Sequence, residues 1–278
     1  MTGEAGRIAA LALAEDGDTD ITSEVTVAAG LEAEAVIEYR SGGVLAGNAF
    51  ADAVAVACSC RIEWRAPDGR LMAAGATVGL IRGRLRHLLR AERPLLNLLQ
   101  RASGIATATR AFVDAVSGTP CRILHTRKTA PGLRALDIAA VLAGGGARHR
   151  AGLAHEVMVK DNHWQALRRS GGTLAAALAD ARERGVRSLQ VEVETIEQVE
   201  EACAAGATRL LVDNQTPQTL GAWARHARDR RAGIEIEATG GIALDTVRSY
   251  AEAGADFISI GALTHSARAG DLAIEVRL

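Results

Sequence analysis

The sequence predicts an α/β protein, in which an α/β barrel follows a separate N-terminal α+β domain. In the second half of the 278-residue chain, short apolar runs alternate with stretches of helical periodicity. Strands that alternate with helices form βαβ units and a parallel sheet. This many units suit a barrel or near-barrel better than a doubly wound sheet, and no GxGxxG motif follows the first run.

The predicted barrel strands are 121–124, 156–159, 188–193, 209–212, 234–237 and 256–260. The helical stretches between most of them include 173–184, 195–204, 216–229 and 244–253.

The N-terminal part has mixed periodicity. We expect strands over 33–39, 61–64 and 77–82, with turns at 42–47 and 67–69. We also expect a helix over 1–14, a polar loop over 15–24 and a helix over 49–57 capped by Asn48.

The apolar spacing over 85–116 is helical, and two residues in it are informative. Pro94 suits a first helical turn, and Gly104 marks a break or a close helix contact. We place the domain boundary near residue 105, which gives an N-terminal domain over 1–105 and a barrel over 106–266.

The composition is that of a globular protein, with 48% hydrophobic and 23% charged residues. A net charge of −1 and 3% aromatic residues argue against a nucleic-acid or anionic-membrane partner. The four cysteines form no CxxC pair and are expected to be buried, reduced thiols. With no signal-like start and no membrane-length apolar run, we expect a cytoplasmic protein.

Each predicted barrel strand ends on polar residues. The carboxyl ends of barrel strands form one face, which carries the active site in such folds. We therefore interpret these polar groups as one site. In the order of the six strands, its members are Arg127 and Lys128, Lys160, Glu192 and Glu194, Asp213 and Asn214, Glu237 to Gly241, and Ser259 to Gly261.

Lysine is rare in this chain. Among 32 Lys and Arg residues only Lys128 and Lys160 are lysines, and each follows a predicted strand. Lysine is a compact charge that can shift its pKa, which indicates a chemical role for both. With Arg127, His149 and Arg150 they form a cationic wall suited to a small anion with several charges.

Two further groups suggest ligands. The segments 239–241 and 261–262 suit phosphate binding through backbone N–H groups, although ordinary tight turns would have the same composition. Glu192 and Asp213 suit Mg²⁺, sugar hydroxyls or a ribosyl cation, although a structural salt-bridge network is an alternative. His155, His163 and His265 lie at no metal-ligand spacing and are expected to form hydrogen bonds.

The motifs that carry a family resemblance are, in chain order, GDTDITSE (17–24), ERPLLNLLQRASGIAT (92–107), HTRKTAPGLR (125–134), AGGGARHR (143–150), VMVKDNH (157–163), VEVE (191–194), VDN (212–214), EATGGI (237–242) and SIGALTHS (259–266). Together they resemble quinolinate phosphoribosyltransferases. The resemblance implies an open α/β barrel, a two-layer N-terminal domain completed by 267–278, and a homodimer with shared active sites. It also implies that quinolinate and 5-phosphoribosyl 1-pyrophosphate react, with Mg²⁺, to give nicotinate mononucleotide, pyrophosphate and carbon dioxide in NAD biosynthesis.

Residue roles follow from the same resemblance. Lys128, Glu192 and Asp213 would be catalytic, with Lys128 at the pyrophosphate-bearing substrate and the two acids at ribose hydroxyls and metal. Quinolinate would be bound by Arg127, His149, Arg150 and Lys160, with Arg93 reaching in from the neighbouring subunit. The 5′-phosphate would lie against Thr239, Gly240, Gly241, Gly261 and Ala262, and Thr126 and Ile260 complete the substrate-binding set.

The sequence departs from the family pattern at His125, Arg148, Pro94 and Thr239. His125 and Arg148 would add positive charge beside the acid-binding wall, which leaves the pyridine acid open. Alternatives are a related phosphoribosyltransferase for another acid, such as the relative associated with molybdenum transport, a Schiff-base aldolase using Lys160, and a phosphosugar sensor.

Overall fold

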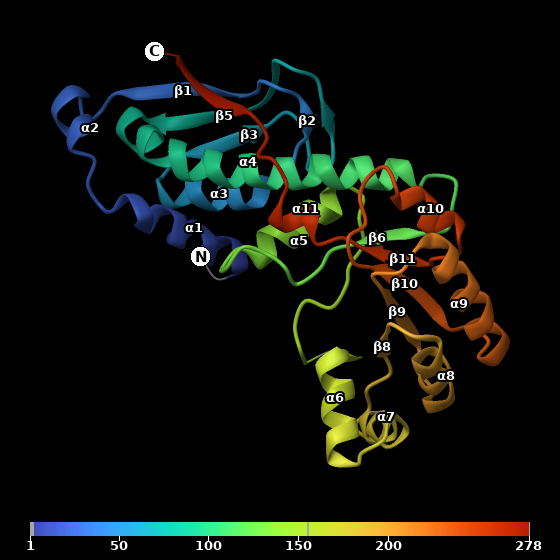
Figure 1. Ribbon diagram of the computed structural model, residues 1–278. Helices are drawn as coiled ribbons and strands as arrows, with labels where there is room; N and C mark the ends of the chain where they lie inside the picture. The colour runs from blue at the N-terminus through green and yellow to red at the C-terminus, as the bar shows by residue number, and fades with distance from the viewer. Residues whose placement is uncertain (1–2, 155, 278) are drawn as a thin grey trace. The chain divides into compact units, whose positions relative to one another are not determined.

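The computed structural model describes residues 3–154 and 156–277, which form two compact units (Figure 1). The first unit takes described residues from Met1–Arg110, Lys128–Gly146 and Ala262–Leu278, and the second comprises Ala111–Arg127 and Ala147–Gly261. Residues 128–146, which the sequence prediction assigned to the barrel domain, therefore group with the first unit. His155 and residues 1 and 2 of the predicted first helix lie outside the described residues.

An antiparallel sheet forms one layer of the first unit. Its strand order is β12-β1-β5-β3, and β2 pairs separately with β4. The strands are β1 Glu32–Tyr39, β2 Gly43–Val44, β3 Arg61–Trp64, β4 Leu71–Met72, β5 Ala76–Arg84 and β12 Leu272–Arg277. The predicted strands 33–39, 61–64 and 77–82 are confirmed. Pairing of β12 with β1 makes the C-terminal segment part of this sheet.

The helices of the first unit are α1 Glu4–Asp16, α2 Ile21–Thr26, α3 Asn48–Ala57, α4 Leu85–Ala115, whose last five residues belong to the second unit, α5 Arg134–Ala143 and α11 Ala262–His265. The predicted loop over 15–24 is wrong in its second half. Asp20 caps α2 by accepting a hydrogen bond from Ser23 N at 3.0 Å. Asn48 is not a cap either, because Gly47 takes that position in a left-handed conformation and the Asn48 amide donates to the Ala66 carbonyl at 3.0 Å.

The helix α4 is continuous over 31 residues, and Pro94 lies inside it. The prediction that Pro94 marks a first helical turn is therefore wrong. A buried apolar face, which includes Leu95, Leu98 and Leu99, stabilises the helix despite the missing N–H. Gly104 does not break it. A Cβ there would overlap the Arg268 carbonyl, so glycine permits close contact with the chain leading to β12.

The second unit is built on a six-stranded parallel sheet of order β6-β11-β10-β9-β8-β7. Its strands are β6 Arg122–Leu124, β7 Val157–Val159, β8 Leu189–Val193, β9 Arg209–Asp213, β10 Glu235–Thr239 and β11 Phe257–Ser259. Its helices are α6 Asp161–Ser170, α7 Leu174–Glu183, α8 Ile196–Ala205, α9 Pro217–Arg230 and α10 Val247–Glu252. All six predicted strands are confirmed. Among the described residues β6 and β7 do not pair, which leaves the barrel open as predicted.

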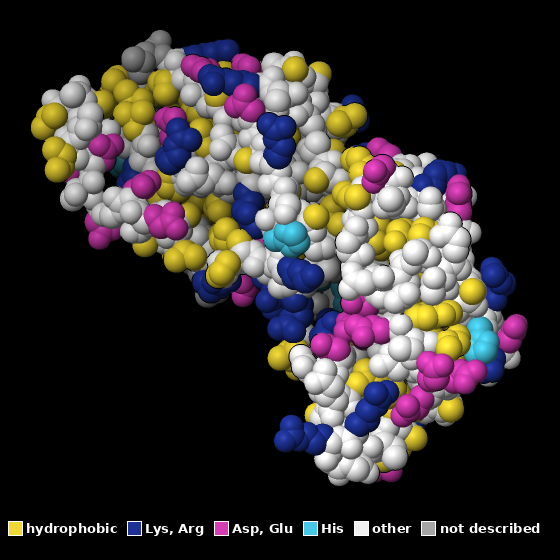
Figure 2. Space-filling view, in the orientation of Figure 1, with side chains coloured by type: hydrophobic (Ala, Val, Ile, Leu, Met, Phe, Trp, Pro, Cys, Tyr) yellow, Lys and Arg dark blue, Asp and Glu magenta, His cyan; other side chains and the backbone are white. Residues whose placement is uncertain are grey.

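The four cysteines are buried and unbridged, which confirms their prediction as buried thiols. Burial raises the pKa of Cys121 to about 12, so this thiol stays protonated. Within the described part of the chain, no helix has the length and apolarity to cross a membrane. Figure 2 shows Lys and Arg side chains interspersed with Asp and Glu over the visible face, in agreement with a net charge of −1.

Candidate active site

The register of the parallel strands places polar side chains on one face of the sheet of the second unit. Gln190, Arg209 and Glu235 are register partners in one row, and Glu192, Leu211 and Glu237 in the next. Thr239 is the partner of Asp213 at the carboxyl ends. Because register partners point to the same side of a sheet, these residues share a face. The carboxyl ends of β8, β9 and β10 thus place Glu192, Asp213 and Thr239 on one face of the sheet, and their convergence with the other predicted residues stays a prediction.

Arg127 and Arg150 form a cationic pair in the second unit. Burial lowers the pKa of the Arg150 guanidinium, and the nearby charge of Arg127 lowers it further. Arginine remains charged under such conditions, so the half-buried Arg150 keeps its charge near that of the exposed Arg127. An anion with two or more charges would stabilise this arrangement.

Lys160 and Glu192 form a direct ion pair. Two contacts at the start of α6 hold the pair in place. His163 Nδ1 accepts a hydrogen bond from Lys160 N at 3.0 Å, and the buried Trp164 donates from Nε1 to the Glu192 carbonyl at 2.8 Å. The predicted hydrogen-bonding role of His163 is confirmed, and Trp164 is a supporting residue that the sequence did not reveal.

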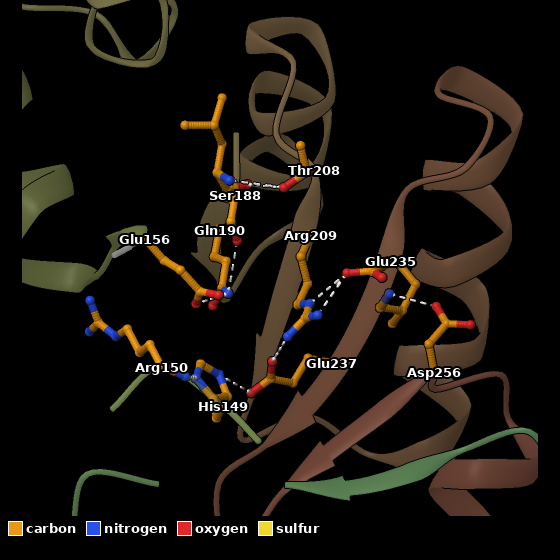
Figure 3. A network of polar contacts seen from close by, with 12 residues as sticks. His149, Arg150, Glu156, Ser188, Gln190, Thr208, Arg209, Glu235, Glu237 and Asp256 are labelled. Atoms are coloured by element: carbon orange, nitrogen blue, oxygen red, sulfur yellow. Dashed lines mark hydrogen bonds and ion pairs between the residues drawn. The ribbon is translucent and has the colours of Figure 1, made fainter. Parts of the chain in front are cut away.

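His149 lies in the second unit with its ring turned inward (Figure 3). Its side chain is 6% exposed, and its Nε2 lies 3.2 Å from Oε1 of Glu237. Its Nδ1 accepts the backbone N–H of Arg150 at 2.6 Å. Both ring nitrogens therefore have protein partners, whereas the Arg150 side chain extends away from the ring.

His125 does not add positive charge to the site, so this prediction is wrong. Its side chain is buried, and its Nε2 accepts the backbone N–H of His149 at 3.1 Å. The ring proton is then on Nδ1, which donates to the Thr126 carbonyl at 3.2 Å. Burial lowers the pKa of His125 and the nearby charge of Arg148 acts in the same direction, whereas the hydrogen bond to the Thr126 carbonyl acts against them. His125 is thus a neutral structural residue.

The predicted phosphate loop packs against the residues that follow β9. Gly240 has a φ of 86°, and a Cβ at this position would overlap the Asn214 side chain and approach Asn214 N to 2.8 Å. Asn214 in turn donates from its amide to Asp213 Oδ2 at 2.6 Å, and its N–H donates to the Thr239 carbonyl at 3.0 Å. The loop therefore orients the Asp213 carboxylate. Ile260 is buried beyond β11, and Gly261 follows it.

Arg93, Lys128 and Ala262 belong to the first unit, and the other predicted site residues belong to the second. Arg93 is exposed on α4. Thr264 donates to the Lys128 carbonyl at 2.7 Å, and the same loop donates from Ala130 N to Asp137 at 3.0 Å. Arg101 forms a two-bond ion pair with the fully buried Asp137 at 2.7 and 2.8 Å.

The donor types at the ends of β8 and β9 fit Mg²⁺. Glu192 and Asp213 offer hard carboxylate oxygens, and Mg²⁺ in proteins often takes one or two carboxylates together with substrate oxygens. No group of three His, Cys, Asp or Glu suited to a metal occurs among the residues that the structure describes. A site of this kind would therefore need substrate oxygens to complete it.

Sequence reasoning placed Glu237 at a strand end but gave it no role, and it overlooked Arg209 and Asp137. These residues act through tertiary contacts. Their only signal in the sequence is an ionisable residue within an apolar run, such as Glu237 in EIEAT and Asp137 in ALDIAA.

The fold and these side chains define an α/β-barrel enzyme for anionic substrates. The family model for the quinolinate phosphoribosyl transferase C-terminal domain matches residues 105–275, and the N-terminal domain model matches residues 20–103. The chain belongs to the quinolinate phosphoribosyltransferase family.

Relatives agree with this assignment. The chain is 40% identical over 286 residues to the chloroplastic nicotinate-nucleotide pyrophosphorylase [carboxylating] of Arabidopsis thaliana, covering 96% of this chain and 81% of that protein. The Mycobacterium leprae enzyme of the same name is 39% identical, covering 92% and 91%. The solved nicotinate-nucleotide pyrophosphorylase of Francisella tularensis superposes with a TM-score of 0.90 at 31% identity, covering 100% and 98%.

Proposed function

We propose that this protein transfers the phosphoribosyl group of 5-phosphoribosyl 1-pyrophosphate to quinolinate, with decarboxylation, in NAD biosynthesis. The products are nicotinate mononucleotide, pyrophosphate and carbon dioxide. The observation that carries the proposal is the Lys160–Glu192 ion pair at the strand ends, in the same unit as the half-buried Arg150 and its cationic neighbour Arg127. Quinolinate is a small dianion and matches the charge of this cationic wall.

In this proposal the cationic residues bind and orient the acid. Arg127, Arg150 and Lys160 hold the two carboxylates, which directs the pyridine nitrogen toward C1 of the ribose. His149 supports this wall rather than contacting the acid, because both of its ring nitrogens already have protein partners. In the proposed homodimer, Arg93 of one subunit extends into the site of the other.

The acidic residues act on the sugar. Glu192 and Asp213 bind ribose hydroxyls and stabilise the positive charge that develops on the ribose. Backbone N–H groups of Thr239, Gly240 and Gly241, with those of Gly261 and Ala262, bind the 5′-phosphate. Thr126 and Ile260 complete the substrate-binding surface. Glu192 and Asp213 would also hold Mg²⁺, which when bound supplies charge stabilisation for the departing pyrophosphate.

Lys128 is proposed to contact the pyrophosphate-bearing substrate. Once the ring nitrogen is bonded to ribose it is positively charged, so it stabilises the electron pair that stays on the adjacent ring carbon when carbon dioxide leaves. A proton from solvent then takes the place of the carboxylate on that carbon. The Schiff-base alternative is not favoured, because it needs a free amine at Lys160 whereas the ion pair with Glu192 stabilises the ammonium.

The test is an assay of the purified protein with quinolinate, nicotinate and related pyridine acids. Pyrophosphate and carbon dioxide should form in equal amounts with quinolinate and not with nicotinate, and Lys128→Ala should abolish both. Turnover of nicotinate in place of quinolinate would contradict the proposal. The homodimer is tested by sedimentation, and the proposed cytoplasmic location by cell fractionation.

A further inference from the structure

Glu237 is a buried carboxylate for which the substrates provide no role. It lies in β10, and its side chain is 0% exposed. Burial alone would raise the pKa of Glu237, but His149, Arg209 and Ser259 together keep it below its ordinary value. The carboxylate is therefore ionised in the interior of the second unit, which is costly without a specific arrangement of partners.

The partners of His149 fix its tautomer. Because the Arg150 N–H donates to Nδ1 at 2.6 Å, that nitrogen carries a lone pair. The ring proton is then on Nε2, which lies 3.2 Å from Oε1 of Glu237. This contact is an electrostatic one, because Oε1 has no partner in hydrogen-bond geometry among the described residues. The negative carboxylate attracts the proton to the nearer nitrogen, so it favours the tautomer that leaves Nδ1 free to accept from Arg150.

A second imidazole holds the preceding backbone group. His125 Nε2 accepts the His149 N–H at 3.1 Å, so two successive N–H groups of the 149–150 segment bind to histidine nitrogens. Ala147, just before this segment, forms a parallel bridge with Leu124 of β6. The backbone that carries Arg150 is thus anchored from both sides.

A simpler reading is that Glu237 neutralises Arg209, which lies 3.2 Å away. Arg209 already has Glu235 as a carboxylate partner at 2.8 Å, and its guanidinium lies 4.0 Å from the centre of the Phe257 ring. Arg209 therefore does not require a second, fully buried carboxylate. His149 has no other acceptor for its Nε2 proton among the contacts of the described residues (Figure 3).

We infer that Glu237 is a positioning residue, whose carboxylate fixes the His149 tautomer and thereby holds the Arg150 backbone in place for binding a dicarboxylate substrate. This inference rests on the proposed function for its kinetic part only. Glu237→Gln is the critical variant. His149 and Arg209 contact different oxygens of the Glu237 carboxylate, so the N–H₂ group of the glutamine amide must face one of these two donors.

The first measurement requires no substrate. Nitrogen-15 spectra of the histidine side chains of the whole protein, with His149 assigned by substitution, should report the Nε2–H tautomer in the wild type and a mixture in Glu237→Gln. The matched control is Glu235→Gln, which removes a carboxylate from Arg209 on the same strand but not from His149. It should leave the His149 tautomer unchanged.

The second measurement is steady-state kinetics. Glu237→Gln should raise KM for quinolinate about tenfold, with kcat and KM for 5-phosphoribosyl 1-pyrophosphate nearly unchanged, since the loss is one of binding geometry. Glu235→Gln should leave all three constants unchanged. His149→Asn keeps an acceptor near the Nδ1 position, and in that background the further change Glu237→Gln should have no added effect on KM.

These measurements distinguish a failure of the proposed function from a failure of the proposed role of Glu237. A wild type that does not turn over quinolinate rejects the proposed function, and the nitrogen-15 spectra then decide the role of Glu237. An unchanged His149 tautomer in Glu237→Gln, equal KM changes in the two glutamine variants, or additive effects with His149→Asn would each overturn the inference. If Glu237→Gln does not fold, a comparison of two His149 variants replaces it. His149→Gln loses the acceptor for the Arg150 N–H and must raise KM for quinolinate, whereas His149→Asn keeps an acceptor there and must not.

Discussion

The Lys160 ammonium and the Glu192 carboxylate form an ion pair at the carboxyl ends of the adjacent strands β7 and β8. The two partners differ in exposure, with 42% of the Lys160 side chain and 9% of the Glu192 side chain accessible. Lys160 can therefore turn toward a substrate anion, whereas Glu192 remains fixed. In this ion pair the lysine neutralises an acid that the proposed reaction uses.

Lys160→Met tests this relationship. The variant loses one charge-assisted contact to quinolinate, so KM should rise by about tenfold to a hundredfold. It also leaves the Glu192 carboxylate without its cation, so the melting temperature should fall. Arg169→Met, at an exposed position near the end of α6, is the control and should change neither quantity. Equal effects of the two variants would show that general charge, not the ion pair, is responsible.

Gly240→Ala tests the phosphate loop. The added methyl group overlaps Asn214 at a φ of 86°, so the loop and the Asp213 carboxylate should both shift. We expect KM for 5-phosphoribosyl 1-pyrophosphate to rise by about tenfold or more, measured by initial rates.

The control for this prediction is Gly233→Ala. Gly233 also has a positive φ, of 78°, but a Cβ there meets no atom within 4 Å. This variant should lose about 1 kcal/mol of stability through backbone strain and keep its KM. A Gly240→Ala enzyme with normal KM would show that the loop does not need close contact with Asn214.

Asp137→Asn tests the support of the loop that carries Lys128. Asp137 is fully buried, and the change leaves the Arg101 guanidinium with a weakened partner. The free energy of unfolding should fall by about 2–3 kcal/mol, measured in urea. Glu4→Gln, which breaks an ion pair whose side chains are 52% and 64% exposed, should change it by less than about 0.5 kcal/mol.

His125 predicts a loss of stability in mild acid. Its pKa in the folded protein lies below the ordinary value of 6.5, so the unfolded chain binds its proton more readily. The contribution of neutral His125 to the free energy of unfolding is therefore fully present above pH 6.5. It is lost as the pH falls through the pKa that His125 has in the folded protein. The melting temperature of the wild type should fall between pH 7 and pH 5, and His125→Gln should show a smaller slope. Glu237 does not affect the stability over this pH range. Its pKa in the folded protein lies below the ordinary value of about 4.5, so its contribution to stability is lost only at lower pH.

Much of the barrel could be predicted because the apolar pattern of each segment agrees with its place in the overall fold. Each apolar run is a strand of one parallel sheet, and this topology by itself brings the ends of β8, β9 and β10 together. Glu192, Asp213 and Thr239 could therefore be assigned to one edge without coordinates. The positions of Arg93 and Lys128 in the assembled site stay predictions.

The failed predictions concern residues whose conformation depends on distant partners. Pro94 lies inside a helix because apolar residues around it are buried, which outweighs its local preference. His125 is neutral because the chain folds over it and supplies a donor from His149, 24 residues away. Glu237 looks like any strand glutamate until the positions of His149 and Arg209 are known.

The sheet order β12-β1-β5-β3 has a consequence for biosynthesis. Strand β1 pairs with a strand that emerges from the ribosome only when residues 272–277 have been synthesised, more than 200 residues later in the chain. Until then one side of β1 has unpaired backbone groups, and Ile37 lacks its partner Ile274. The nascent chain must therefore keep this edge from pairing with other polypeptides until its own C-terminal strand arrives.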